Sequence, residues 1–261
     1  MSANAQTGSQ PTTVSITSGS LKLRAHVWMP KGSGPFPAVL FSPGSGQNPE
    51  PHTLGRLFAR HGYVFMALYR RGQGLSADQG KEAGSLMRSE RTANGDESAN
   101  RLQLRLLDGE ELQQQRDALS VLRALPKVDP GRVAIVGFSF GGSLAMVHAE
   151  EDQTIRAVIS FGGAAGSWNR SPQLRERLIS AARKLTTPVL FVFAANDHTT
   201  LPAEVLSAEM GRGKPNAKVQ VKIYPAFGTT VQEGHHLIYL SIPTWEQDVF
   251  AFLKSHNAPR K

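Results

Sequence analysis

Short apolar runs that alternate with helical patterns constrain the fold of this chain more than any other feature. Each run is four to six residues long and continuous, without the polar alternation of a sheet that is solvated on one face. Continuous runs of this length are typical of parallel strands that are covered on both faces. The sequence therefore predicts an α/β fold with a mostly parallel central sheet and helices on both faces. The buried strands are expected at residues 38–41, 63–68, 133–136, 157–161 and 189–193.

The remaining segments complete one expected domain over residues 14–257, with no internal repeat and no linker. Residues 14–17 and 21–29 are expected to form two antiparallel strands, and 219–224 a last strand before the final helix. Asp108 and Glu111 have the spacing of a capping box at a helix start, and Pro126 would end that helix. Further helices are expected at 53–61, 139–150 and 171–184, at a start near Pro202, and around an apolar stripe from Trp245 to Leu253.

Two segments stand apart from this alternation. Residues 78–107 are rich in charged residues, Ser, Gly and Asn, and a loop of that length is often a lid or a binding insertion. An ordinary crossover helix is an equally weighted alternative. Residues 1–13 are polar and are expected to form a disordered tail. Within them, Ala3-Asn4-Ala5 resembles the end of a signal-peptidase site, so we expect a soluble protein that is cytoplasmic, or periplasmic or secreted if a leader is removed before Gln6.

Composition excludes several classes of function. The chain has no cysteine, which rules out disulfides, thiolate metal sites and a cysteine nucleophile. Its net charge is +8, but the basic residues are scattered, and we expect no nucleic-acid partner. No apolar run approaches the roughly 18 residues of a membrane span.

One motif carries specific chemistry. Gly137-Phe138-Ser139-Phe140-Gly141-Gly142 contains the only G-x-S-x-G of the chain; it follows the 133–136 strand and opens a helix. A strand, a sharp turn and a helix form the setting of a nucleophile elbow, which exposes the serine at a helix N-terminus. We therefore expect Ser139 to be a nucleophile. The alternative is a plain glycine-rich turn.

A serine nucleophile needs a base and an orienting acid, and the order along such chains is Ser, then Asp or Glu, then His. Asp197 follows the 189–193 strand, at the carboxyl edge of the sheet where ligands bind. His235 and His236 lie in an expected loop at 225–242, and Gly234 gives the first of them the freedom to reach the serine. The candidate acid and base are thus Asp197 and His235. The alternatives are a helix cap for Asp197 and a loop histidine pair without a role.

Other candidate residues complete the expected site. The oxyanion hole is expected from the N–H groups of Phe140 and Ser45, the second within the turn after the 38–41 strand. Phe138, Phe140 and Trp168 are candidate pocket walls, with core packing as an equally weighted alternative. Arg70 is a candidate for binding a substrate carboxylate, although a solvated surface position is favoured. No metal and no cofactor are expected, because neighbouring His235 and His236 diverge and no carboxylate–histidine cluster stands at helical spacing in the sequence.

These segments together resemble the dienelactone hydrolase-related and prolyl oligopeptidase-like branch of the α/β-hydrolase superfamily, from about residue 21 to residue 253. Residues 43–46 resemble its His-Gly-Ser-Gly oxyanion loop, with proline in place of histidine. Residues 69–76 resemble its Arg-Gly-x-Gly-x-Ser segment, 195–197 its acid segment and 233–235 its Gly-His base segment. The chain departs from dienelactone hydrolases proper, whose nucleophile is a cysteine.

The resemblance and the site residues together predict a serine carboxylic-ester hydrolase. It would act through an acyl-enzyme on small or short-chain esters, with a small-molecule ester as its only implied partner; the oligomeric state is left open. A peptidase or amidase on the same triad is the first alternative, although peptidases of this branch usually carry an added β-propeller. A non-catalytic ligand-binding member of the fold is the second.

Overall fold

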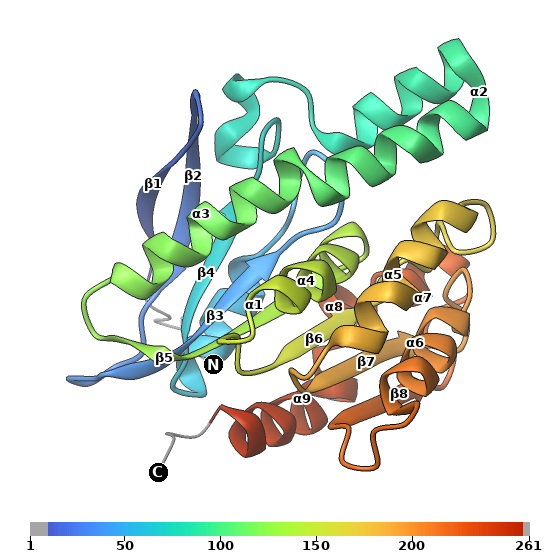
Figure 1. The fold of residues 1–261 in the computed structure, drawn as a ribbon. Coiled ribbons are helices and arrows are strands. Elements are labelled where there is room, and N and C mark those ends of the chain that lie inside the picture. Colours follow the sequence, from blue (N-terminus) through green and yellow to red (C-terminus); the bar gives the residue numbers. More distant parts are fainter. Residues whose placement is uncertain (1–9, 258–261) are drawn as a thin grey trace, which may run out of the picture.

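Eight strands form one sheet in the computed structural model of this chain, which describes residues 10–257 (Figure 1). The strand order is β1-β2-β4-β3-β5-β6-β7-β8. β2 pairs antiparallel with β1 and with β4, and the pairs from β4 through β3 to β8 are parallel. This topology confirms the predicted α/β fold. The strands are β1 (Thr12–Ser18), β2 (Leu21–Trp28), β3 (Phe36–Ser42), β4 (Val64–Tyr69), β5 (Val128–Phe138), β6 (Val158–Phe161), β7 (Val189–Ala194) and β8 (Val219–Tyr224).

Burial explains why the central strands are continuously apolar. Every residue of β4, β6 and β7 is buried, because helices cover both faces of the sheet. The edge strand β8 is partly exposed along its whole length and carries polar residues between its apolar ones. The predicted strands therefore match the observed ones closely, and the main difference is that β5 begins earlier, at Val128.

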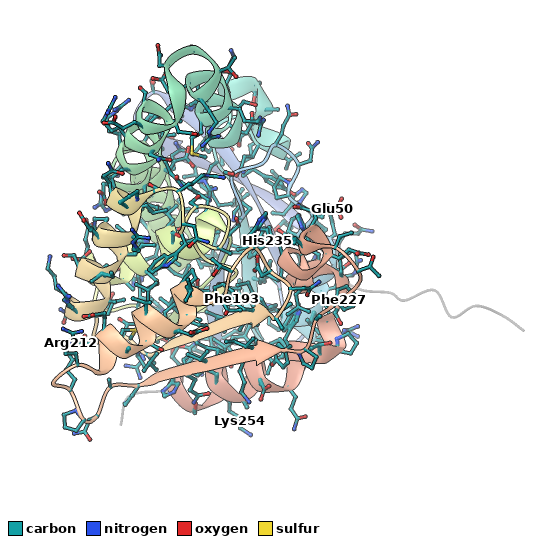
Figure 2. All side chains as sticks on the ribbon, turned by 90° about the vertical axis from the view of Figure 1, so that its right-hand side faces the viewer. Glu50, Phe193, Arg212, Phe227, His235 and Lys254 are labelled. Atoms are coloured by element: carbon teal, nitrogen blue, oxygen red, sulfur yellow. The ribbon has the colours of Figure 1, made fainter. Side chains whose placement is uncertain are left out.

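Two helical layers enclose the sheet. One core cluster packs α3 (Glu110–Ala124), α4 (Phe140–Glu151), α5 (Pro172–Lys184) and α6 (Leu201–Gly211) on one face. A second cluster packs α1 (His52–Arg60) and α9 (Ile242–His256) on the other. Figure 2 shows side chains filling the space between the sheet and these helices. The layers leave the carboxyl ends of the parallel strands as the place where a site can open.

The segment at residues 78–107 is helical. A 3₁₀ turn, η1 (Gly74–Gln79), precedes α2 (Ala83–Asp108), and Gly95 interrupts α2 with a φ of 82°. In Figure 1, α2 extends beyond the sheet and turns back at its tip. The structure thus has the crossover-helix alternative in place of an irregular loop, while a role as a cover over the site stays a prediction.

Three local expectations need correction. The expected loop at 225–242 contains two short helices, α7 (Val231–His235) and α8 (Leu237–Leu240). α3 begins after Gly109 without a side-chain cap, because Glu111 points into the interior and pairs with an arginine. β1 begins at Thr12, inside the expected tail; the leader proposed before Gln6 lies outside the described residues. Among residues 10–257, no helix is both long enough and apolar enough to cross a membrane.

Candidate active site

The turn between β5 and α4 holds Ser139 in a conformation that side chains rarely adopt. Its φ is 53° and its ψ is −116°, and its N–H donates to the carbonyl of Phe161 at 2.8 Å. A Cβ on Gly137 would lie 2.2 Å from the carbonyl oxygen of Gly141, and one on Gly141 would lie 2.0 Å from that of Ser42. Only glycine fits at these two positions. Strained backbone of this kind is a mark of functional sites, and here it exposes the serine side chain at the start of α4.

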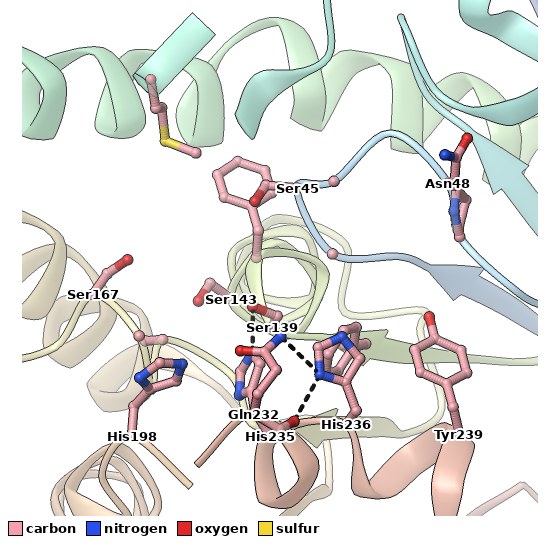
Figure 3. A pocket seen from close by; sticks show the side chains of 18 of the residues that line it. Ser45, Asn48, Ser139, Ser143, Ser167, His198, Gln232, His235, His236 and Tyr239 are labelled. Carbon is pink, nitrogen blue, oxygen red and sulfur yellow. Dashed lines mark hydrogen bonds between the residues drawn. The ribbon is translucent and has the colours of Figure 1, made fainter. Parts of the chain in front are cut away.

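Ser139, His235 and Asp197 form one chain of hydrogen bonds. His235 Nε2 lies 3.0 Å from Ser139 Oγ (Figure 3), and His235 Nδ1 lies 2.8 Å from Asp197 Oδ1. Both partners of the second bond are buried, with Asp197 7% and His235 8% exposed. In this arrangement Nδ1–H donates to the carboxylate, and Nε2 accepts from the serine hydroxyl. The structure therefore brings together the three residues that the sequence singled out from β5, β7 and the segment after β8.

Asn196 holds the histidine segment in place. Its Nδ2 donates to the carbonyls of Phe227 and Thr230, each at 2.9 Å, and its Oδ1 accepts from Phe227 N–H. A capping box between Thr230 and Glu233 then begins α7, which ends at His235. The capping-box spacing at residues 230–233 was the signal that could have revealed this helix from the sequence.

Two further histidines, His198 and His236, lie beside His235. His198 N–H donates to Asp197 Oδ1 at 2.6 Å, and the His198 ring lies 5.1 Å from that of His235. Burial, with a smaller contribution from the charge of His235, lowers the pKa of His198 and favours its neutral form. His236 is turned to Gln232, whose carbonyl lies 2.9 Å from its Nδ1. His198 thus supports the acid through its backbone, whereas the hydrogen bonds of His236 connect it to α7.

The two expected oxyanion donors belong to residues close to the proposed nucleophile. Phe140 is the first residue of α4, so its N–H has no acceptor within the helix. Ser45 lies in the turn after β3, beside Gly44, where a Cβ would lie only 3.6 Å from Ser139 Cβ. Both residues line a cavity of about 610 Å³ that also contains Ser139 and His235. Both residues therefore lie at the cavity of the proposed nucleophile, and their role as oxyanion donors stays a prediction.

The cavity has polar and aromatic walls. Figure 3 shows His198 and Ser167 on one side of Ser139, and Tyr239 and Asn48 on the other. Phe138 and Phe140 both line it, as expected. α2 contributes Met87 and Gln103, two contacts that the irregular composition of this segment did not reveal.

Trp168 and Arg70 do not lie where the sequence analysis placed them. Trp168 is 2% exposed and packs in the core cluster under α5, so it is not a pocket wall. Arg70 is 1% exposed and faces the interior, where its Nε donates to Glu111 Oε2 at 2.5 Å. It is therefore neither a surface residue nor free to meet a substrate carboxylate.

Asp197, His198 and His235 also form a group whose potential ligand atoms lie within 4.8 Å of one another. A cation bound there would compete for atoms that already hold hydrogen bonds, because His235 Nδ1 and Asp197 Oδ1 bind each other. It would also pull the imidazole from Ser139. The donor set therefore fits a hydrogen-bonded triad better than a metal centre.

Comparison with known proteins places the chain in a family. Residues 23–237 match the model of the dienelactone hydrolase family. A protein of Synechocystis sp. named for carboxymethylenebutenolidase activity is 26% identical over 218 residues, which is 82% of this chain and 83% of that protein.

Solved structures of low identity share the fold. An esterase of Pyrococcus furiosus has a TM-score of 0.65 at 16% identity, covering 95% of this chain and 94% of that one. An acylaminoacyl peptidase of Pyrococcus horikoshii has a TM-score of 0.69 at 15% identity over 97% of this chain, which spans only 42% of that longer protein. The match of the family model over most of the chain, together with this fold, shows that the chain belongs to the dienelactone hydrolase family of α/β-hydrolases.

Proposed function

We propose that this member of the family is a serine carboxylic-ester hydrolase that works through an acyl-enzyme. The observation that carries the proposal is the continuous hydrogen-bond chain from Ser139 Oγ through His235 to the buried Asp197 carboxylate. A serine hydroxyl is a weak nucleophile until a neighbouring base can accept its proton. The chain has no cysteine that could take the place of Ser139.

The proposed reaction has two halves. In the first, Ser139 Oγ attacks the ester carbonyl while His235 Nε2 takes its proton, and the imidazolium then protonates the departing alcohol. In the second, water attacks the acyl-serine, His235 accepts a proton from it, and the acid leaves as Ser139 regains its hydrogen. Asp197 keeps the imidazole in the required tautomer. The N–H groups of Phe140 and Ser45 would stabilise the negative charge on the carbonyl oxygen in both halves.

The pocket supports a small ester as the substrate. A volume of about 610 Å³ lies in the range of small-molecule sites. Phe138 and Phe140 supply apolar contacts, while Asn48, Gln103 and Ser167 supply polar ones around the same space. A panel of p-nitrophenyl esters of increasing acyl length, with peptide p-nitroanilides beside it, separates the ester proposal from the peptidase alternative.

A labelling experiment tests the nucleophile. A fluorophosphonate probe should modify the protein at Ser139, and Ser139→Ala should abolish labelling and reduce turnover on the order of 10⁴-fold or more. Ser143→Ala, one turn further along α4 and also in the cavity wall, is the matched control and should still be labelled. EDTA should leave the rate unchanged. Ester hydrolysis that persists in Ser139→Ala, or that EDTA removes and zinc restores, would refute the mechanism.

A further inference from the structure

The turn that contains Ser45 has its carbonyl groups fixed by other parts of the chain. Arg70 Nη2 donates to the carbonyls of Pro43 and Gly44, each at 2.9 Å. Gln73 Nε2 donates to those of Gly44 and Gly46, at 2.8 and 2.6 Å. These donors come from the segment after β4 and act on the turn after β3. The conformation of the turn is therefore set from outside.

Backbone N–H groups bind the two remaining carbonyls of the turn, those of Ser45 and Gln47. The carbonyl of Ser45 accepts from Gly84 N–H at 2.9 Å, and that of Gln47 from Gly74 N–H at 2.9 Å. A Cβ on Gly84 would lie 2.7 Å from Ser45 O, so the start of α2 can approach this closely only as glycine. Each carbonyl from residue 43 to residue 47 thus has a donor.

The Gly44 carbonyl determines the direction of the Ser45 N–H. The two groups belong to one planar, trans peptide unit, and they point to opposite sides of it. Arg70 and Gln73 hold the carbonyl on the side away from the cavity, whose lining includes Ser45 and Ser139 but neither of these two donors. The N–H consequently faces the side on which the nucleophile lies. Glycine at position 44 would otherwise let this peptide rotate easily.

Burial of the charged Arg70 and the polar Gln73 costs free energy of folding. Arg70 and Glu111 are each 1% exposed, and Gln73 is also 1% exposed. A buried ion pair is often no more stabilising than an apolar pair of the same volume. All three guanidinium nitrogens of Arg70 donate: Nε to Glu111, Nη1 to Ser42 Oγ at 3.0 Å, and Nη2 to two carbonyls. Only the planar guanidinium of arginine offers several N–H donors in a fixed geometry to acceptors placed in this way.

We propose that Arg70 and Gln73 are positioning residues that aim the Ser45 N–H at the oxyanion. The inference rests on the proposed ester hydrolysis and extends it to two residues that belong neither to the cavity lining nor to the proposed triad. An oxyanion donor acts mainly in the transition state, where the carbonyl oxygen becomes charged. Loss of its orientation therefore lowers kcat and leaves KM nearly unchanged.

Gln73→Met is the decisive variant, because it removes both amide donors while keeping the shape and leaves no buried charge. Gln114→Met is its matched control: Gln114 is also 1% exposed and accepts from Arg71 N–H at 2.8 Å, but it donates to none of the turn's carbonyls. We expect kcat on a p-nitrophenyl ester to fall on the order of 10²-fold in Gln73→Met, with KM within about twofold. Binding of a trifluoromethyl ketone, which mimics the tetrahedral state, should weaken in parallel. Gln114→Met should keep both constants.

A second variant and a structural measurement separate positioning from general damage. Arg70→Lys keeps a positive charge for Glu111 but loses the fork, and kcat should again fall while KM holds. Crystal structures should show the Gly44–Ser45 peptide rotated or in two orientations in Gln73→Met, and in one orientation in the parent and in Gln114→Met. A peptide that stays fixed in Gln73→Met overturns the proposal whatever the kinetics, as does a rotated peptide with unchanged kcat. A parent enzyme that hydrolyses no ester refutes the proposed function instead, and the peptide orientation still decides the positioning role.

Discussion

The nucleophile elbow and the oxyanion turn lie side by side, but different forces hold them. At the elbow, Gly137 and Gly141 allow backbone segments to meet so closely that no other residue fits, and the conformation follows largely from steric contact of backbone with backbone. In the oxyanion turn, Arg70 and Gln73 donate from the segment after β4 and fix the backbone through its carbonyls. The first kind of constraint leaves a motif in the sequence. The second leaves single residues whose purpose appears only in three dimensions.

The histidine segment combines both kinds of constraint. Its capping box at Thr230 and Glu233 is local, while the clamp from Asn196 comes from the end of β7. A Cβ on Gly234 would lie 2.5 Å from Asn196 Oδ1, so the clamp also requires glycine before the base. The base is thus aligned by a short motif and by one distant amide together.

The largest effect is expected where this segment meets the nucleophile. His235→Ala should cost turnover on the order of 10⁴-fold or more, because it leaves Ser139 without a proton acceptor. His236→Ala is the matched control and should keep most activity, since His236 Nδ1 faces the carbonyl of Gln232. Initial rates with one ester decide the matter, and the opposite pattern would assign the base to His236.

A smaller effect tests whether steric contacts hold the backbone of the elbow but not that of the oxyanion turn. Gly141→Ala would place a Cβ 2.0 Å from Ser42 O, and even a shift of about 1 Å in Ser139 can cost on the order of 10²-fold in rate. Gly46→Ala, in the oxyanion turn, meets nothing within 4 Å and should change the free energy of unfolding by less than about 0.5 kcal/mol. Urea denaturation and ester kinetics of both variants provide the test. A harmless Gly141→Ala would show that the elbow is not held by sterics.

The last effect concerns the stability of the fold in acid and involves a histidine on the helix that follows the elbow. Burial lowers the pKa of His148 on α4 to about 4 from an ordinary value of 6.5, and Gln115 Nε2 lies 3.1 Å from its Nδ1. Below pH 6.5 the unfolded chain binds a proton that the folded chain refuses until about pH 4. The free energy of unfolding should therefore fall by about 3 kcal/mol as the pH drops from 6.5 to 4. Above pH 6.5 this histidine should not make the unfolding free energy depend on pH.

His148→Gln removes this titration. The difference in unfolding free energy between parent and variant, measured by urea denaturation, should be constant above pH 7 and should shift by about 3 kcal/mol in favour of the variant at pH 4. A difference that does not change with pH would show that His148 is not held neutral by burial.

The predictions from sequence succeeded where local pattern and chain order suffice. Continuous apolar runs located the central strands because both faces of the sheet are covered. The relation of Ser139, Asp197 and His235 to the strand ends predicted that they would meet, and the structure brings them within hydrogen-bond distance. Their catalytic roles stay proposals.

The expectations that failed depended on partners far away in the chain. Arg70 was placed at the surface or in the pocket because nothing near it in sequence reveals Glu111 as its partner. Glu111 itself has the spacing of a helix cap, and its burial beside Arg70 overrode that preference. Trp168 comes shortly after the end of β6, a position where pocket residues are expected, but its ring packs in the apolar core with residues of α5. Propensity could not anticipate these tertiary choices.

The projecting helix α2 has a consequence for how such a chain can diversify. Met87 and Gln103 of this helix line the cavity, while none of the three proposed triad residues lies on it. Its turning point at Gly95 has a φ of 82°, which disfavours other residues there, so the positions open to change are those that line the cavity. Substitution of Met87 or Gln103 would change the cavity wall and leave the proposed triad in place, so directed evolution of the substrate range can start from this helix.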